Sequence, residues 1–148
     1  MLHRIALLFH LLGLVLFIGG AVAQTQLIKA SAAKELNDAV RDKYEELAAF
    51  CSKKLELPGL FLQIASGALF IYLFPGYLKA PWLHIKLTFV AALLVLCHME
   101  MINASRIVKA RKAGNLSEID ARKKKHSVMG AIGTVCVVAI VGVVIFGR

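Results

Sequence analysis

The chain has 148 residues, of which 59% are hydrophobic, and it carries a formal net charge of +9. A mean hydropathy of +0.72 excludes an ordinary soluble domain and makes the lipid bilayer the expected partner. The charges gather between the apolar segments, as they do in loops of membrane proteins, so the basic character does not predict nucleic-acid binding. We expect an all-α integral membrane protein in which residues 1–148 form one transmembrane four-helix bundle.

The first apolar segment covers residues 5–28 and is long enough to cross about 30 Å of hydrocarbon. Its beginning also resembles a cleavable signal peptide, because His3 and Arg4 precede it and small residues follow at 21–23. The apolar run continues past that point and contains His10, so we favour a first membrane span.

Residues 31–56 are polar but carry apolar side chains at steps of three and four residues, which is the period of an amphipathic helix. We expect a solvated helix here that connects the first two spans at the cytoplasmic surface. Residues 57–74 form the second span, with Pro58 in its first turn, where proline is tolerated. The short turn after it makes the second and third spans antiparallel neighbours.

The third span is expected at 82–108 and the fourth at 127–146, where Gly130, Gly133 and Gly142 allow close helix packing. The loops that precede the second and fourth spans hold most of the lysine and arginine residues. The opposite side has three basic residues, Arg4, Lys79 and Arg148. The rule that positive loops stay inside therefore predicts both termini outside, in a multi-pass protein of the bacterial inner (plasma) membrane.

Two histidines lie at similar depth in this topology. His10 is in the first span and His84 in the third, and both spans run in the same direction, which puts both side chains within roughly 10 Å of the outer boundary. Two imidazoles at equal depth could ligate one metal centre, and haem iron commonly takes axial histidine. The alternative is that both are packing residues that hydrogen bond to neighbouring helices.

The third span also carries two polar stripes with a spacing of fourteen residues. His84 shares one side with His98, and Lys86 shares another with Glu100. Lys86 is expected either to extend toward the interface or to contact a substrate carboxylate. We expect Glu100 and His126 to be solvated.

The motif Trp82-x-His84-x-Lys86 with His98 in the same helix, together with His10 in the first span, resembles the HemJ-type bacterial protoporphyrinogen IX oxidases. The likeness is best between residues 53 and 112. It implies a protein that binds haem b and oxidises a porphyrinogen to a porphyrin in the membrane. It also implies iron ligation by His10 and His84, cofactor contacts from these two residues and from Trp82, and catalytic roles for Lys86 and His98. In the haem-binding hypothesis, Lys86 or Arg4 would hold a carboxylate near the outer face.

The chain departs from the family pattern in two places. Gln24 and Gln26 lie where the family usually has a Leu-Pro-Arg turn, and Lys125-His126-Ser127-Val128 replaces an Asn-Glu-x-Pro segment. These departures are compatible with a divergent relative that takes another electron donor.

Three other functions are compatible with the same residues. A b-type cytochrome subunit would bind haem and carry electrons without porphyrinogen turnover. A copper-handling protein, with a looser likeness to CopD-type copper-resistance proteins, would need more thioether ligands than four methionines offer. A membrane scaffold would use its histidines only for packing. Four spans without a soluble domain leave much helix surface uncovered, which is compatible with a homodimer.

Overall fold

The computed structural model describes residues 1–147, so Arg148 lies outside the described residues. Its elements are α1 (Leu2–Ala30), α2 (Asp38–Cys51), the π-helical turn η1 (Ser52–Glu56), α3 (Leu57–Leu73), the 3₁₀ turn η2 (Pro75–Lys79), α4 (Pro81–Lys112) and α5 (Leu116–Phe146). Four helical stretches are long and apolar enough to cross a membrane. The prediction of an all-α, multi-pass membrane protein is confirmed.

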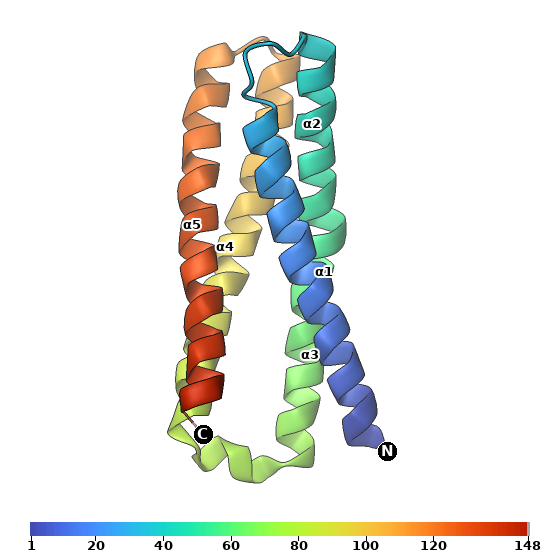
Figure 1. The fold of residues 1–148 in the computed structure, drawn as a ribbon, viewed down its shortest axis with the longest axis vertical. Helices are drawn as coiled ribbons and strands as arrows, with labels where there is room; N and C mark the ends of the chain where they lie inside the picture. Colours follow the sequence, from blue (N-terminus) through green and yellow to red (C-terminus); the bar gives the residue numbers. More distant parts are fainter. Residues whose placement is uncertain (148) are drawn as a thin grey trace.

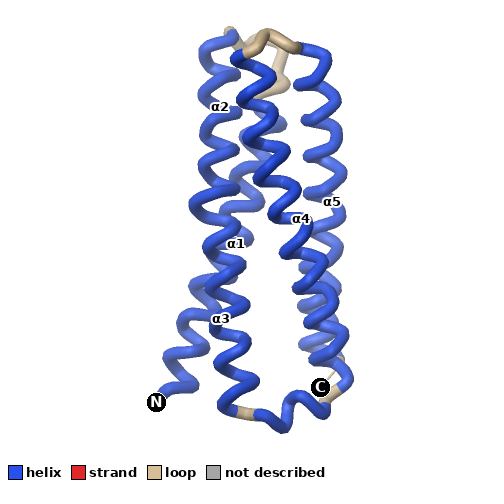
Figure 2. The backbone as a smooth tube through the Cα atoms, turned by 180° about the vertical axis from the view of Figure 1, so that it is seen from behind, coloured by secondary structure: helices blue, strands red, loops and turns tan. Residues whose placement is uncertain are grey.

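The helices form two pairs. The first helix, α1, packs along the rod formed by α2 and α3, and α4 packs along α5 (Figure 1). The turns at 31–37 and 113–115 meet at one end of the bundle, which we call the charged end, whereas η2 and both chain termini lie at the other (Figure 1). The two pairs are close together at the charged end and separate toward η2 (Figure 2).

The segment between the first two spans differs from the prediction. The structure shows no separate amphipathic helix in the described part of this segment, because α2, η1 and α3 continue into one another as a single helix of 36 residues. This helix begins at Asn37, whose side chain accepts a hydrogen bond from the backbone N–H of Val40 at 2.9 Å. Its apolar face buries Ala48 beside Ile28 of α1, so α2 continues the helix of the second span and packs along α1.

Glycines let α1 and the α2–α3 rod touch backbone to backbone. A Cβ atom on Gly59 would lie 2.5 Å from the backbone nitrogen of Phe17, and one on Gly20 would lie 2.6 Å from that of Glu56. Small residues permit such approach in membrane helices. Close packing was predicted for the fourth span at Gly130, Gly133 and Gly142. A Cβ on Gly130 would lie 3.5 Å from the hydroxyl oxygen of Thr25, whereas among the described atoms nothing lies within 4 Å of one on Gly133 or Gly142.

This contact gives a first prediction. Gly20→Ala should destabilise the bundle by about 1–3 kcal/mol, because the new methyl group meets the backbone of η1 and the helices must shift. Gly19→Ala is the matched control, since a Cβ there meets no described atom within 4 Å and alanine favours the helix. Thermal unfolding in detergent, followed by circular dichroism, checks both. Equal midpoints for the two variants would contradict the close approach.

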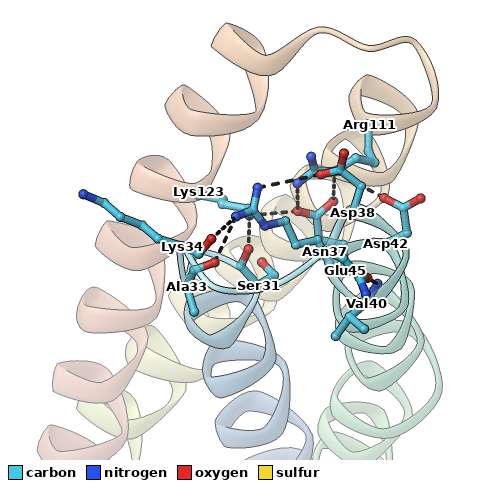
Figure 3. Close-up of polar contacts among 11 residues, drawn as sticks. Ser31, Ala33, Lys34, Asn37, Asp38, Val40, Asp42, Glu45, Arg111 and Lys123 are labelled. Carbon is cyan, nitrogen blue, oxygen red and sulfur yellow. Dashed lines mark hydrogen bonds and ion pairs between the residues drawn. The ribbon is translucent and has the colours of Figure 1, made fainter.

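A buried ion cluster ties the charged end together (Figure 3). Glu45 of α2 is 1% exposed and accepts two hydrogen bonds from Arg111 of α4, at 2.7 and 3.1 Å. Lys123 of α5 lies 2.8 Å from the same carboxylate and also donates to the carbonyl oxygen of Ser31, just after α1, at 3.3 Å. Burial alone would raise the pKa of Glu45, but the hydrogen bonds and charges of Arg111 and Lys123 outweigh it and lower the pKa. One carboxylate thus links three helices.

Candidate functional site

His10 lies in the interface between α1 and α3. Its Nδ1 is 3.0 Å from the hydroxyl oxygen of Ser66, and its ring meets Phe70 edge-on with centroids 6.1 Å apart. The Ser66 hydroxyl oxygen lies 2.7 Å from the carbonyl oxygen of Leu62 in its own helix and donates its single hydrogen there, so it accepts from Nδ1–H of His10. This arrangement fixes the neutral tautomer of His10 in which Nε2 keeps its lone pair.

His84 has the opposite tautomer and a different environment. Its Nε2 lies 2.9 Å from the carbonyl oxygen of Leu78, and because a carbonyl can only accept, Nε2 carries the hydrogen. The side chain is exposed on α4. His10 is held by Ser66 of α3 and His84 by Leu78 of η2, so the two rings have different hydrogen-bond partners. The beginnings of α1 and α4 also lie on opposite sides of the bundle (Figure 2).

The other predicted residues also separate into interior and exterior positions. Lys86 is half-buried and lies near enough to His10 for its charge to act on the imidazole. Trp82 packs edge-on against Tyr77 with ring centroids 5.9 Å apart, near η2. Arg4 and His98 are exposed. The structure therefore brings Lys86 toward His10 but brings neither Arg4 nor His98 into the interior.

The two polar stripes of α4 are present, but the stripe that is exposed and the stripe that is buried are the reverse of our expectation. His84 and His98 lie on the outer face, whereas Glu100 of the other stripe is only 6% exposed. The prediction that Glu100 is solvated is wrong, because α1 and η1 cover it. The prediction that His126 is a surface residue is also wrong, since it is 1% exposed.

A group of four polar side chains from three helical segments fills the middle of the bundle. Glu56 ends the π-helical turn η1, where Leu57 N–H bonds the carbonyl of Ser52, five residues back. Gln24 of α1 is fully buried and donates from Nε2 to Glu56 and, at 3.4 Å, to Glu100. Cys97 donates from its thiol to Glu56 at 3.2 Å. Gln24 follows Gly20 by one helical turn, and Cys97 precedes Glu100 by three residues, so helix geometry puts the two members of each pair on one face of their helix.

The two carboxyl groups differ in what they can do. They share one donor, because Nε2 of Gln24 lies within hydrogen-bond distance of an oxygen of each. Both oxygens of Glu56 accept hydrogen bonds, one from Gln24 and the other from Cys97. Oε1 of Glu100 has no hydrogen-bond partner within the described structure.

A cavity of about 390 Å³ opens beside this group, between α1 and α5. Glu56, Cys97 and Glu100 form its floor. Its rim includes the exposed residues Val22 and Thr134, so it opens on the lateral surface of the bundle, which faces lipid in a membrane. The walls are largely apolar and include Phe17, Leu93 and Val137, whereas Gln26 and Lys29 lie toward the charged end.

The sequence analysis did not identify Glu56 and Gln24 as residues of this site. Glu56 belongs to a polar segment that we expected in a connecting loop, and Gln24 was noted only as a departure from a family pattern. The available signal was that each lies directly beside an apolar span. Polar side chains that lie at the depth of the hydrocarbon need partners within the bundle. Within residues 1–147 no three or more metal-binding side chains gather around one point.

Comparison with known proteins supports the family resemblance at a distance. The chain is 35% identical over 92 residues to the protoporphyrinogen IX oxidase of Synechocystis sp.. The match covers 59% of this chain and 44% of that oxidase, so the chain matches less than half the length of its relative. No family model matches the chain. No solved structure matches it either.

Proposed function

We propose that the chain is a membrane oxidoreductase that oxidises a porphyrinogen or a chemically similar apolar donor. The observation that carries the proposal is the similarity to protoporphyrinogen IX oxidase in a chain that has buried acid–base groups beside a lateral cavity. A cavity of this size and apolar character suits an organic ligand that arrives from the lipid phase. Buried carboxyl groups with unequal hydrogen bonding are suited to hold the protons that such an oxidation releases.

Haem b is the proposed electron acceptor, and His10 fits it better than His84 does. A histidine that binds a metal usually donates its other ring N–H to a neighbour, as His10 Nδ1 does to Ser66. Gly67 leaves room next to the ring, since a Cβ there would lie 3.8 Å from Cε1 of His10. Bound haem would supply one-electron chemistry. The predicted pairing of His10 and His84 on one iron does not fit one chain, because His84 Nε2 is already a donor to Leu78.

The remaining assignments belong to the same proposal. Lys86 would hold a carboxylate of the cofactor or donor near His10. Trp82 would contact the cofactor from the η2 end, while Arg4 and His98 would contribute only through exposed surfaces. The charged end would face the cytoplasm of a bacterial cell and both termini the outside, with the whole chain as one transmembrane domain and a homodimer covering exposed helix surface.

The test is an absorption spectrum of purified, oxidised and reduced protein, with wild type beside His10→Ala and His84→Ala. We expect a Soret band in the wild type, its loss in His10→Ala and its retention in His84→Ala, because His10 is held through Nδ1, whereas Nε2 of His84 already donates to Leu78. A wild type without extractable haem would contradict the haem assignment. Loss of the band in His84→Ala alone would reverse the choice of ligand.

A b-type cytochrome without porphyrinogen turnover is the second candidate, and the His10 tautomer favours it equally. Complementation of a bacterial strain that lacks porphyrinogen oxidase separates the two functions. Growth without added haem supports the oxidase, whereas a haem-loaded protein that fails to restore growth supports the electron carrier.

A further inference from the structure

Two buried polar side chains have no role in the site described above. His126 of α5 is 1% exposed, and neither of its ring nitrogens has a hydrogen-bond partner in the described structure. Asn103 of α4 is 3% exposed. Its amide nitrogen donates to the carbonyl oxygen of Arg122 at 2.9 Å, whereas its Oδ1 has no partner among the described residues. Buried polar atoms without partners are rare, and an ionisable side chain inside a membrane bundle usually marks a functional position.

The antiparallel register of α4 and α5 puts these two side chains near one level. Asn103 contacts the backbone of Arg122, and Glu100 lies beside Gly130, where a Cβ would be 3.6 Å from its Oε1. His126 is midway between Arg122 and Gly130 in the sequence, so it lies between the levels of Asn103 and Glu100. Both side chains are therefore next to the mid-bundle carboxyl groups, on the side of the charged end.

Polar side chains continue from this level to the charged end. Lys123 precedes His126 by three residues, close to one helical turn, and lies 2.8 Å from the carboxylate of Glu45 (Figure 3). Arg111 joins the same carboxylate to Asp42, whose side chain is 47% exposed. The unpartnered atoms thus lie between the carboxyl groups in the middle of the bundle and an ion cluster that reaches solvent.

Water fits the chemistry of the unpartnered atoms. A buried water molecule needs about two to four polar partners, and the two ring nitrogens of His126 with Oδ1 of Asn103 supply three. A neutral imidazole accepts at one ring nitrogen and donates from the other, so water bound on both sides can pass a proton in at one nitrogen and out at the other. The ring is neutral again after the transfer, and no electron moves.

We propose that His126 and Asn103, with bound water, form a proton path between Glu100 and the charged end. This inference deepens the proposed function and rests on it only for the source of the protons. Protons that an oxidation releases at the lateral cavity pass along this path to water at the charged end, while the electrons go to the proposed haem. The competing route is the cavity itself, because Lys29 and Gln26 line it toward the same end.

The thiol of Cys97 reports on this path without haem and without turnover. It is 3% exposed and donates to Glu56 at 3.2 Å, so exchange of its hydrogen with solvent measures proton access to the middle of the bundle. Replacement of the other two cysteines, Cys51 and Cys136, by alanine leaves one thiol in the full chain. The decay of its S–H infrared band is followed after transfer of lipid nanodiscs to heavy water, and the amide band records backbone exchange in the same spectra.

His126→Leu should slow thiol exchange roughly tenfold or more, and far more than backbone amide exchange, because leucine neither binds water nor carries a proton. His98→Leu is the matched control, since it makes the same substitution at an exposed histidine of α4, and it should exchange at the wild-type rate. Asn103→Leu should also slow thiol exchange, and it tests the path if circular dichroism shows that His126→Leu fails to fold.

Thiol exchange at the wild-type rate in His126→Leu and Asn103→Leu overturns the inference, and so does slowing by Gly130→Val alone, which would assign proton entry to the cavity. A parallel slowing of thiol and amide exchange also overturns it, because a change in stability then explains both. A wild type that neither binds haem nor oxidises porphyrinogen, but whose thiol exchange depends on His126, overturns only the proposed function. A haem-loaded, active wild type whose thiol exchange is independent of His126 overturns only the inference.

Discussion

Glu45→Ala is expected to destabilise the bundle by about 3–5 kcal/mol, the largest loss among the substitutions considered. The substitution leaves Arg111 and Lys123 without their main partner, although their side chains are only 12% and 13% exposed. Removal of one member of a buried ion group costs more than the group contributes as a whole, because the remaining charges stay away from water. Unfolding by sodium dodecyl sulfate in mixed micelles, followed by circular dichroism, measures the loss.

The neighbouring residue provides the control. Glu46 pairs with Lys43 and Lys112 across the surface, so Glu46→Ala should change the unfolding midpoint little. A loss as large as that of Glu45→Ala would show that net charge, and not the buried cluster, sets the stability of this end.

The same cluster predicts how stability depends on pH. The pKa of Glu45 is lower in the folded protein than its ordinary value of roughly 4.3, because Arg111 and Lys123 overcome the effect of burial. The stabilisation is therefore fully present above that ordinary value and is lost as pH falls through the lowered pKa. Glu45→Gln should be less stable at neutral pH and show a smaller loss below pH ~4. An unchanged acid limb in Glu45→Gln would assign the acid sensitivity to other carboxylates.

Gln24→Leu is expected to cost about 2–4 kcal/mol, because it removes the amide that donates to both Glu56 and Glu100. Leucine has a similar size, so the loss reports hydrogen bonding to the carboxyl pair more than packing. Detergent unfolding of the purified variant measures it, and the mid-bundle position of Gln24 makes the effect visible in helix content.

Gln63→Leu is the matched control for this substitution. Gln63 is half-buried and donates only a long hydrogen bond of 3.4 Å to the carbonyl oxygen of His10, which has its own helical partner. We expect a loss well under that of Gln24→Leu. Similar losses for both variants would show that the carboxyl pair does not need the amide, and would contradict the interior network.

The sequence by itself determined the membrane architecture. Long apolar runs separated by clusters of lysine and arginine have few alternatives to spanning helices, because the backbone must satisfy its own hydrogen bonds in lipid. The spacing of fourteen residues also placed His84 with His98 and Lys86 with Glu100, since helix geometry fixes which side chains share a face.

Only the tertiary structure decided which of those faces is inside. Two sides of α4 carry polar stripes, His84 with His98 and Lys86 with Glu100, so hydrophobicity alone does not indicate which of them faces the interior. Packing decided it: α1 and the α2–α3 rod approach at Gly20 and Gly59, which brings Glu56 and Gln24 to the level of Glu100. That approach depends on contacts between residues more than thirty positions apart, and no local pattern in one sequence contains them.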